Sequence, residues 1–352
     1  MTRASDDIIA DPIGRYPHAT VACFDPTRGA PPRRRLDEAR TAAFLERLAE
    51  VGVPAALIAS STGQGHLRTV EELDAWFRCA AQAECGEMLL MALLRPEDGP
   101  AATDRLLDLL AETAYPVVFL RPGTDLPADA DDAQVSDSLA PFVAAAAARG
   151  LAIGLYSIPD VSGLPLTPDA AARLVASEGG DHIVAVKVTE ADYDRSTARF
   201  LAHPDLARLK IVQGWDPHLI RALRDGPRFD AHGRQRVGVT SGLMSLAVHQ
   251  YKHILSAAAE KAWDEAARAQ EAATALFEAM QDDPRSFADL QRAKYIMGLG
   301  HPLSAAVTED QVERVFAALE GLPRAADRMR LARSLDLMGD GPFHQRLVRL
   351  AE

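Results

Sequence analysis

Short apolar runs recur through the first two thirds of the chain at a nearly regular interval. Their starts lie 26 to 35 residues apart, a spacing that accommodates a strand, a loop and a covering helix. The runs are almost continuously apolar, as in parallel strands that are buried on both faces. Eight such units favour a closed barrel over an open doubly wound sheet. The predicted strands are residues 19–24, 53–59, 88–94, 116–120, 151–156, 183–188, 209–213 and 236–240.

The segments between these runs begin with residues that favour helix starts. Thr69 followed by Glu72 predicts a capping box, in which the two side chains bond free backbone N–H groups of the first turn. Thr167 and Asp216 each precede a proline, so each is expected to cap a helix that has proline at its first position. Gly52 and Gly150 stand just before predicted strands and suit the left-handed conformation that ends a helix.

One segment between strands does not have a helical pattern. Residues 125–138 are acidic and contain proline. We expect them to form a long loop over the mouth of the barrel.

The pattern changes past residue 258, where helical spacing of apolar residues replaces the strand runs. Helices are expected near 259–281, 286–297, 309–320, 324–337 and 343–351. We expect these helices to form a layer that packs on the barrel or on another subunit. The predicted fold class is therefore α/β, a (β/α)8 TIM barrel with a helical C-terminal extension. The predicted domains are a catalytic barrel over 1–257 and a C-terminal helical region over 258–352.

The balance of charge and the cysteine content restrict the class of protein. The chain has 38 basic and 50 acidic residues, a net charge of −12, which argues against binding of nucleic acid or of an anionic membrane. Its three cysteines predict neither a disulfide framework nor a zinc site, and fit a reducing compartment. Neither a signal peptide nor a run of about 18 apolar residues is evident, so we expect a cytoplasmic protein without a membrane span.

Lys187 is the residue that the apolar pattern explains least, because lysine is almost never fully buried. The run that contains it alternates between two faces, with Val184, Val186 and Val188 on one and Ile183, Ala185 and Lys187 on the other. The bulkier valine face suits the helix layer, so Lys187 is expected inside the barrel near its carboxyl end, where active sites of this fold lie. Burial would lower the pKa of the amine from about 10.4 toward neutrality and prepare it to attack a ketone. The alternative is a lysine that reaches solvent from the strand end.

Tyr156 has the same position on the preceding strand. It shares a face with Ala152 and Gly154, whose small side chains are expected to leave room for a bound molecule. A phenol can move protons between an amine, a carbinolamine and a leaving hydroxyl group. An interior tyrosine is often structural, but its expected place beside Lys187 favours a catalytic role.

A turn rich in hydroxyl groups and glycine follows the second predicted strand. Residues 60–65 read Ser-Ser-Thr-Gly-Gln-Gly. Hydroxyl and backbone N–H groups in such a turn suit a carboxylate or a phosphate, although an ordinary loop can have the same composition.

These segments together resemble the motifs of the dihydrodipicolinate synthase/N-acetylneuraminate lyase family of class I aldolases. Residues 60–64 stand at the place of the family's Gly-Thr-Thr-Gly-Glu, and residues 156–163 (Tyr-Ser-Ile-Pro-Asp-Val-Ser-Gly) at that of Tyr-Asn-x-Pro-x-x-Thr-Gly. Residues 184–187 match the run that ends in the Schiff-base lysine. Gly214 and residues 238–241 are similar to the motifs that line the oxo-acid site. The similarity spans roughly residues 17–300, in the family's order.

The resemblance implies a function and a set of site residues. Lys187 would form an imine with a 2-oxo acid such as pyruvate or a sugar-derived keto acid, and Tyr156 would relay protons. Ser61 and Thr62 would hold the acid's carboxylate, and Gly214 and Thr240 would line the same site. The imine is an electron sink, so a bond to the adjacent carbon can form or break. The resemblance thus implies a lyase, aldolase or dehydratase that works as a dimer or tetramer of identical subunits.

The chain departs from the family pattern in the region of the second substrate. Val161 occupies the place of the arginine that grips the second carboxylate in dihydrodipicolinate synthases. Their tyrosine after the fourth strand is also missing from residues 119–122. We therefore expect no true dihydrodipicolinate synthase, and a distal pocket that is more apolar unless Arg68 or Arg121 supplies a cation.

Two other functions remain compatible with the sequence. One is a barrel enzyme of another class in which Lys187 is a simple cation for a phosphate or carboxylate, and the other is a non-catalytic oxo-acid sensor. His249 and His253 lie one helical turn apart, as metal ligands often do, but no third ligand is evident. The chain has no dinucleotide or P-loop motif, and we expect neither a metal nor a cofactor.

Overall fold

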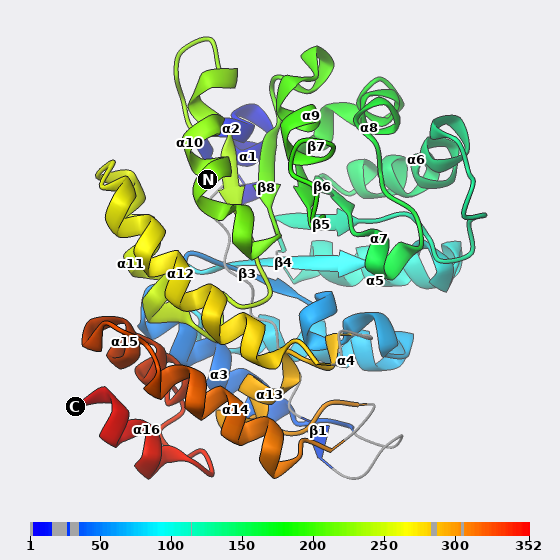
Figure 1. Ribbon diagram of the computed structural model, residues 1–352. Coiled ribbons are helices and arrows are strands. Elements are labelled where there is room, and N and C mark those ends of the chain that lie inside the picture. The colour runs from blue at the N-terminus through cyan, green and yellow to red at the C-terminus, as the bar shows by residue number, and fades with distance from the viewer. Residues whose placement is uncertain (1–2, 16–26, 29–34, 114, 283–286, 304–305) are drawn as a thin grey trace.

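The structure is a computed structural model that describes residues 3–15, 27–28, 35–113, 115–282, 287–303 and 306–352. Seven parallel strands form one curled sheet, in which each strand pairs with the next along the chain (Figure 1). They are β3 (Ala55–Ile58), β4 (Leu89–Leu94), β5 (Val117–Leu120), β6 (Ala152–Ser157), β7 (Ile183–Val188), β8 (Lys210–Gln213) and β9 (Val237–Val239). All seven were predicted, whereas the strand predicted at 19–24 lies outside the described residues. The fold is the α/β fold of a (β/α)8 barrel with additional C-terminal helices.

The helices that cover this sheet alternate with its strands. They are α3 (Glu38–Glu50), α4 (Val70–Gln82), α5 (Pro100–Glu112), α6 (Asp132–Ala148), α7 (Pro159–Ser162), α8 (Pro168–Val175), α9 (Thr197–Ala202), α10 (Leu219–Asp225) and α11 (Val248–Ala259). A short antiparallel pair, β1 (Thr27–Arg28) and β2 (Arg35–Leu36), precedes α3.

The predicted helix signals are mostly confirmed. Thr69 forms its capping box with Glu72, and Thr167 accepts a hydrogen bond from the N–H of Ala170. Gly52 and Gly150 have the expected positive φ, +79° and +70°.

Two predictions, one of a loop and one of a helix cap, are wrong. The loop predicted over 125–138 gives way at Asp132 to α6, because Asp131 and Gln134 form a capping box there. Asp216 caps no helix, because its buried carboxylate is occupied by hydroxyl groups from Ser241 and Tyr251.

The strands divide their side chains between the barrel interior and the helix layer. On β7, Val186 and Val188 belong to the core under the helices and Ala185 to the interior, as predicted. Val184 lies in the interior cluster and Ile183 in the outer one, which reverses the prediction for these two residues. The cause is a register shift between β6 and β7 at Ile153, which changes the phase of alternation at the start of β7.

A layer of C-terminal helices lies against one side of the barrel (Figure 1). They are α12 (Trp263–Met280), α13 (Gln291–Ile296), α14 (Glu309–Glu320), α15 (Ala325–Leu335) and α16 (His344–Ala351). α12 packs on both α10 and α11, and α14 and α15 pack on α12. These helices agree with the predicted ones apart from their ends.

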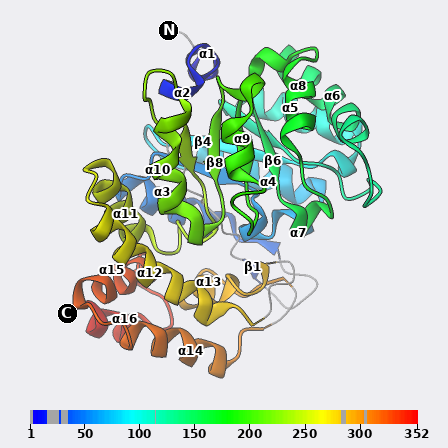
Figure 2. The same ribbon diagram turned by 45° about the horizontal axis from the view of Figure 1, so that its top comes forward.

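Two N-terminal helices, α1 (Ala4–Ala10) and α2 (Pro12–Arg15), lie at the opposite end of the molecule from α13 and α14 (Figure 2). Ile8 of α1 belongs to the barrel-interior cluster together with Leu57 and Val184. The N-terminal segment therefore closes the amino end of the barrel. Among the described residues, no helix is both long enough and apolar enough to cross a bilayer.

Candidate active site

Lys187 and Tyr156 lie side by side on neighbouring strands. They are register partners across β6 and β7, and each is the fifth of the six residues in its strand. The Nζ atom of Lys187 lies 4.2 Å from the centre of the Tyr156 ring. Lys187 is only 4% exposed, so it does not extend into solvent from the strand end. The period-two interpretation of these two strands therefore placed both side chains correctly.

Thr189 extends this pair toward the carboxyl end of the barrel. Its Oγ1 atom lies 3.1 Å from the hydroxyl oxygen of Tyr156, within hydrogen-bonding distance. The two hydroxyl groups form a short chain along which a proton can move. Sequence reasoning missed Thr189, although it lies two residues after Lys187 and hence on the same face of the strand.

Two glycines fix the space around these residues. A Cβ atom at Gly214 would clash with Thr189 Oγ1 and would lie 3.2 Å from Lys187 Cε, so only glycine lets the chain pass so close to the lysine. At Gly154, a Cβ atom would overlap with the ring of Phe119. The space expected beside Gly154 is therefore filled by Phe119. The open volume lies farther along the barrel, at the carboxyl ends of the strands.

That open volume is a cavity of about 350 Å³ at the carboxyl ends of the barrel strands. Its lining combines polar residues of the barrel with residues of the C-terminal layer. The lining residues are Thr62, Tyr156, Asp160, Lys187, Thr189, Gly214, Trp215, Asp216, Gly242, Phe277, Gln281, Phe287, Asp289 and Leu290. It is the location at which enzymes of this fold carry their active sites.

The predicted site residues are brought together only in part. Thr62, Tyr156, Lys187 and Gly214 line the cavity, and Thr62 packs closely against Gly242. Ser61 and Thr240 are buried next to it but are not among its lining residues. Within the described part of the chain, the Oγ atom of Ser61 has no hydrogen-bond partner.

Asp216 is the most unusual residue that the sequence interpretation missed. Its Oδ1 atom accepts hydrogen bonds from Ser241 Oγ, at 2.5 Å, and from the hydroxyl of Tyr251 on α11. Burial raises the pKa of Asp216 to about 7, while the Ser241 hydroxyl, a backbone N–H and the charge of Lys187 act against that increase. A carboxyl group that can gain or lose a proton near neutral pH thus lies beside the lysine.

The two arginines considered as distal cations are held outside the cavity. Arg121 donates to Glu97, with one contact of 3.2 Å, and to the carbonyl of Pro122 at 2.8 Å. Arg68 is paired with Glu72 at 3.4 Å. Neither arginine is among the residues that line the cavity, so neither supplies the cation that Val161 lacks.

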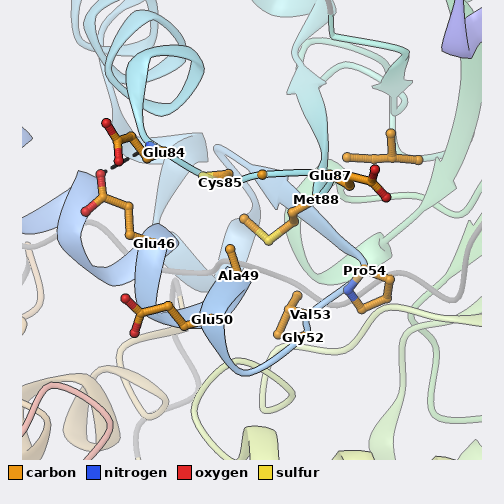
Figure 3. Close-up of a pocket in the computed structure, with 12 residues that line it drawn as sticks. Glu46, Ala49, Glu50, Gly52, Val53, Pro54, Glu84, Cys85, Glu87 and Met88 are labelled. Carbon is orange, nitrogen blue, oxygen red and sulfur yellow. Dashed lines mark hydrogen bonds between the residues drawn. The ribbon is translucent and has the colours of Figure 1, made fainter.

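A larger hollow, of about 690 Å³, lies at the amino ends of β3 and β4 (Figure 3). Glutamates from α3 and from the segment before β4 surround it, together with Cys85 and Met88. Burial raises the pKa of the Cys85 thiol to about 11, which keeps it protonated at neutral pH. Of the described residues that line this hollow, none offers a nucleophile comparable with Lys187.

One histidine of the pair on α11 pairs with a carboxylate of the neighbouring helix. His253 Nε2 lies 2.7 Å from the Glu265 carboxylate of α12. In the described part of the chain, no group of three or more His, Cys, Asp or Glu side chains is arranged to hold a metal ion.

Comparisons with known proteins agree with this geometry. Residues 138–314, half of the chain, match the model of the dihydrodipicolinate synthetase family. A 4-hydroxy-tetrahydrodipicolinate synthase of Xanthomonas axonopodis pv. citri (strain 306) is 27% identical over 312 residues, which cover 82% of this chain and 91% of that protein.

Solved structures support the fold. YagE, a prophage protein of this family from E. coli K12 whose structure contains pyruvate, has a TM-score of 0.72 at 18% identity and covers 87% of this chain and 98% of its own. A 2-keto-3-deoxygluconate aldolase variant of Sulfolobus solfataricus has a TM-score of 0.69 at 16% identity and covers 87% of this chain and 96% of its own. The chain therefore belongs to the dihydrodipicolinate synthetase family, a family of class I lyases and aldolases.

Proposed function

We propose that this protein is a Schiff-base lyase or aldolase that acts on a 2-oxo acid through Lys187. The observation that carries the proposal is a buried lysine stacked on a tyrosine, in a cavity at the carboxyl ends of the barrel strands. The pyruvate-containing structure of YagE and the keto-acid aldolase of Sulfolobus solfataricus support this choice of substrate class.

The residues that line the cavity suit each step of imine formation. Lys187 Nζ attacks the keto carbon and gives a carbinolamine, while the keto oxygen takes up a proton. Loss of that oxygen as water, after a second proton transfer, leaves the imine. The Tyr156 hydroxyl, bonded to Thr189, lies where it can move both protons. Thr62, with Ser61 behind it, would hold the substrate carboxylate.

The imine then allows chemistry at the next carbon. Removal of a proton from that carbon gives an enamine, and the enamine carbon attacks an aldehyde whose oxygen takes up a proton. Water hydrolyses the product imine and restores the free amine. The same steps in reverse cleave a carbon–carbon bond. Apart from Lys187, the described residues that line the cavity include no cation in place of the arginine missing at Val161, so aspartate semialdehyde is not proposed as the partner.

Borohydride trapping tests the nucleophile directly. Incubation with pyruvate and borohydride should add one reduced pyruvyl group, and peptide mapping should place it on Lys187. The chain has only five lysines, so the assignment is unambiguous. Lys187→Ala should abolish the mass shift. An unchanged adduct in that variant would exclude Lys187, and trapping without turnover across an aldehyde panel would indicate an oxo-acid sensor.

The quaternary structure and the division of the chain are part of the proposal. We expect a homo-oligomer in the cytoplasm, with a molar mass in solution, measured by light scattering, of two or four subunits. The proposed domain boundary after residue 257 separates two regions that both contribute to the cavity, since Phe277, Gln281, Phe287, Asp289 and Leu290 follow it.

A further inference from the structure

We propose that Gln291, on α13 of the C-terminal layer, is a positioning residue for the first substrate, because it holds the turn that would bind the substrate carboxylate. This inference rests on the proposed function, which assigns that role to Thr62 with Ser61 behind it. Gln291 is not among the residues that line the cavity, so it would act through the turn. Other side chains of the same region line the cavity and would contact the second substrate directly. They are Phe277, Gln281, Phe287, Asp289 and Leu290.

The side-chain amide of Gln291 bonds the turn directly. Its Nε2 atom donates to the backbone carbonyl of Thr62 and, at 3.3 Å, to the carbonyl of Phe287 in its own segment. Gln291 is only 1% exposed, so bulk water does not reach this contact. A buried carbonyl that loses its donor is costly, and the contact therefore stabilises one orientation of the Thr62 carbonyl.

The Thr62 carbonyl belongs to a peptide group that is held at both ends. The N–H of the same group, on Gly63, donates to the carbonyl of Ser60 at 3.1 Å. Because a peptide group is planar, bonds to its carbonyl and to its N–H together fix the orientation of the whole unit. The Thr62 side chain branches from one end of this unit and lines the cavity, so Gln291 helps to set where the Thr62 hydroxyl lies.

The turn depends on support from outside because its own backbone is strained. Ala59 precedes it and Gln64 ends its first helical turn, with φ of +60° and +59°, values that residues other than glycine rarely adopt. Strained backbone persists only where the surrounding structure holds it. The C-terminal region provides a second contact at Gln64, whose Oε1 atom accepts from the N–H of Leu303 at 2.8 Å.

Packing around the Thr62 side chain leaves it little freedom. A Cβ atom added at Gly242 would lie 2.5 Å from Thr62 Oγ1 and 2.8 Å from Leu290 Cδ1, so the three residues are in close contact. Leu290 directly precedes Gln291. The same short segment of the C-terminal region therefore bonds the backbone of Thr62 and packs near its side chain.

Gln291→Met tests the proposal, because methionine has a similar length but no donor. The Oε1 atom of Gln291 has no hydrogen-bond partner within the described part of the chain, so the substitution removes only the donor contacts. The initial rate of imine trapping by cyanoborohydride is measured over a series of pyruvate concentrations. The half-saturation concentration should rise about 5- to 30-fold, the usual effect of losing one buried hydrogen bond. The maximal trapping rate should stay within about threefold, because Lys187 and Tyr156 are unchanged.

Two comparisons separate positioning from a general loss of structure. Gln235 is a matched control at the amino end of the barrel, where its amide donates to the Leu223 carbonyl at 2.8 Å and accepts from the N–H of Val237 at 3.0 Å. Gln235→Met should leave the half-saturation concentration for pyruvate within about twofold, since it is remote from the turn. Methyl pyruvate lacks the carboxylate, so Gln291→Met and the original protein should be half-saturated at similar concentrations of this ester.

The outcomes distinguish this inference from the proposed function. If the original protein forms no adduct, the imine mechanism fails and the role of Gln291 fails with it. If the adduct forms and Gln291→Met has an unchanged half-saturation concentration for pyruvate, only the positioning role is refuted. An equal weakening for pyruvate and methyl pyruvate would also refute it. Should Gln291→Met not fold, Gln291→Asn, whose amide is one carbon shorter, should show the same selective loss for pyruvate.

Discussion

The two ends of the barrel each contain a buried lysine, and the comparison shows that two equally buried lysines can have very different surroundings. Lys210, at the start of β8, is 3% exposed, and its Nζ donates to the carbonyls of Ile13 and Gln235, both at 2.9 Å. Burial lowers the pKa of Lys210 to about 8. Lys187 is as deeply buried, but it lies over an aromatic ring and lines a cavity. The two lysines therefore differ in their access to a cavity and in the groups around the amine, not in their burial.

The largest expected difference between them is in activity. Lys187→Met should lower turnover by on the order of 10³-fold or more, because the nucleophile is lost. Lys210→Met should leave turnover within a few-fold of the original. Steady-state kinetics on the two purified variants measures both effects. A comparable loss of activity in both would show that the two ends are not functionally distinct.

Tyr156→Phe tests whether the neighbour of Lys187 matters chemically. The ring remains beneath the amine but the hydroxyl that faces Thr189 is removed, so we expect a rate loss of about 10²–10⁴-fold. Tyr193 is a matched control. Its hydroxyl donates to Asp225 at 2.9 Å, and it is not among the residues that line the cavity. Full activity in Tyr156→Phe, or an equal loss in Tyr193→Phe, would assign proton transfer to another group.

Lys210→Met should instead reduce stability. The carbonyls of Ile13 and Gln235 would each lose a charged donor in a buried position, at a cost of about 1–3 kcal/mol each. Urea unfolding should show the loss, and hydrogen exchange should increase first in α1 and α2. If exchange there does not change, the contact with Lys210 is not what holds these helices to the barrel.

Asp216→Asn addresses a smaller effect, the pH dependence of stability. The folded state binds the Asp216 proton more tightly than the unfolded chain does, since its pKa is raised to about 7. The free energy of unfolding therefore falls as pH rises from about 4 to 7, by at most about 1.4 kcal/mol for each unit of pKa difference. In Asp216→Asn this contribution should disappear. Parallel curves for the two proteins over this range would show that Asp216 has an ordinary pKa.

Much of the fold follows from local sequence patterns. The spacing of apolar runs predicted seven strands to within two residues at each end, and their alternation placed Lys187 beside Tyr156. The same alternation failed at Ile183 and Val184, because a register shift depends on how two strands pair and has no signal within either strand. The prediction of open space beside Gly154 was wrong for a related reason, because the Phe119 ring that fills this space comes from a different strand.

The outer part of the site could not be predicted in this way. Asp216 precedes a proline, which is also the pattern of a helix cap, and only the folded chain brings Ser241 and Tyr251 to its carboxylate. Phe277 and Asp289 belong to a region whose pattern predicts helices and nothing about chemistry. Phe277 lines the cavity because α12 packs on α10 and α11, a contact between helices that has no signal in the local sequence.

In this arrangement, the residues proposed for the two halves of the reaction come from different parts of the chain. The groups that would make the imine come from adjacent barrel strands, whereas Phe277, Gln281, Phe287 and Asp289 come from the C-terminal region after residue 257. We expect that exchanging the C-terminal region between relatives would leave the strand register that positions Lys187 undisturbed. A single scaffold could in this way acquire new partner aldehydes while its nucleophile stays unchanged.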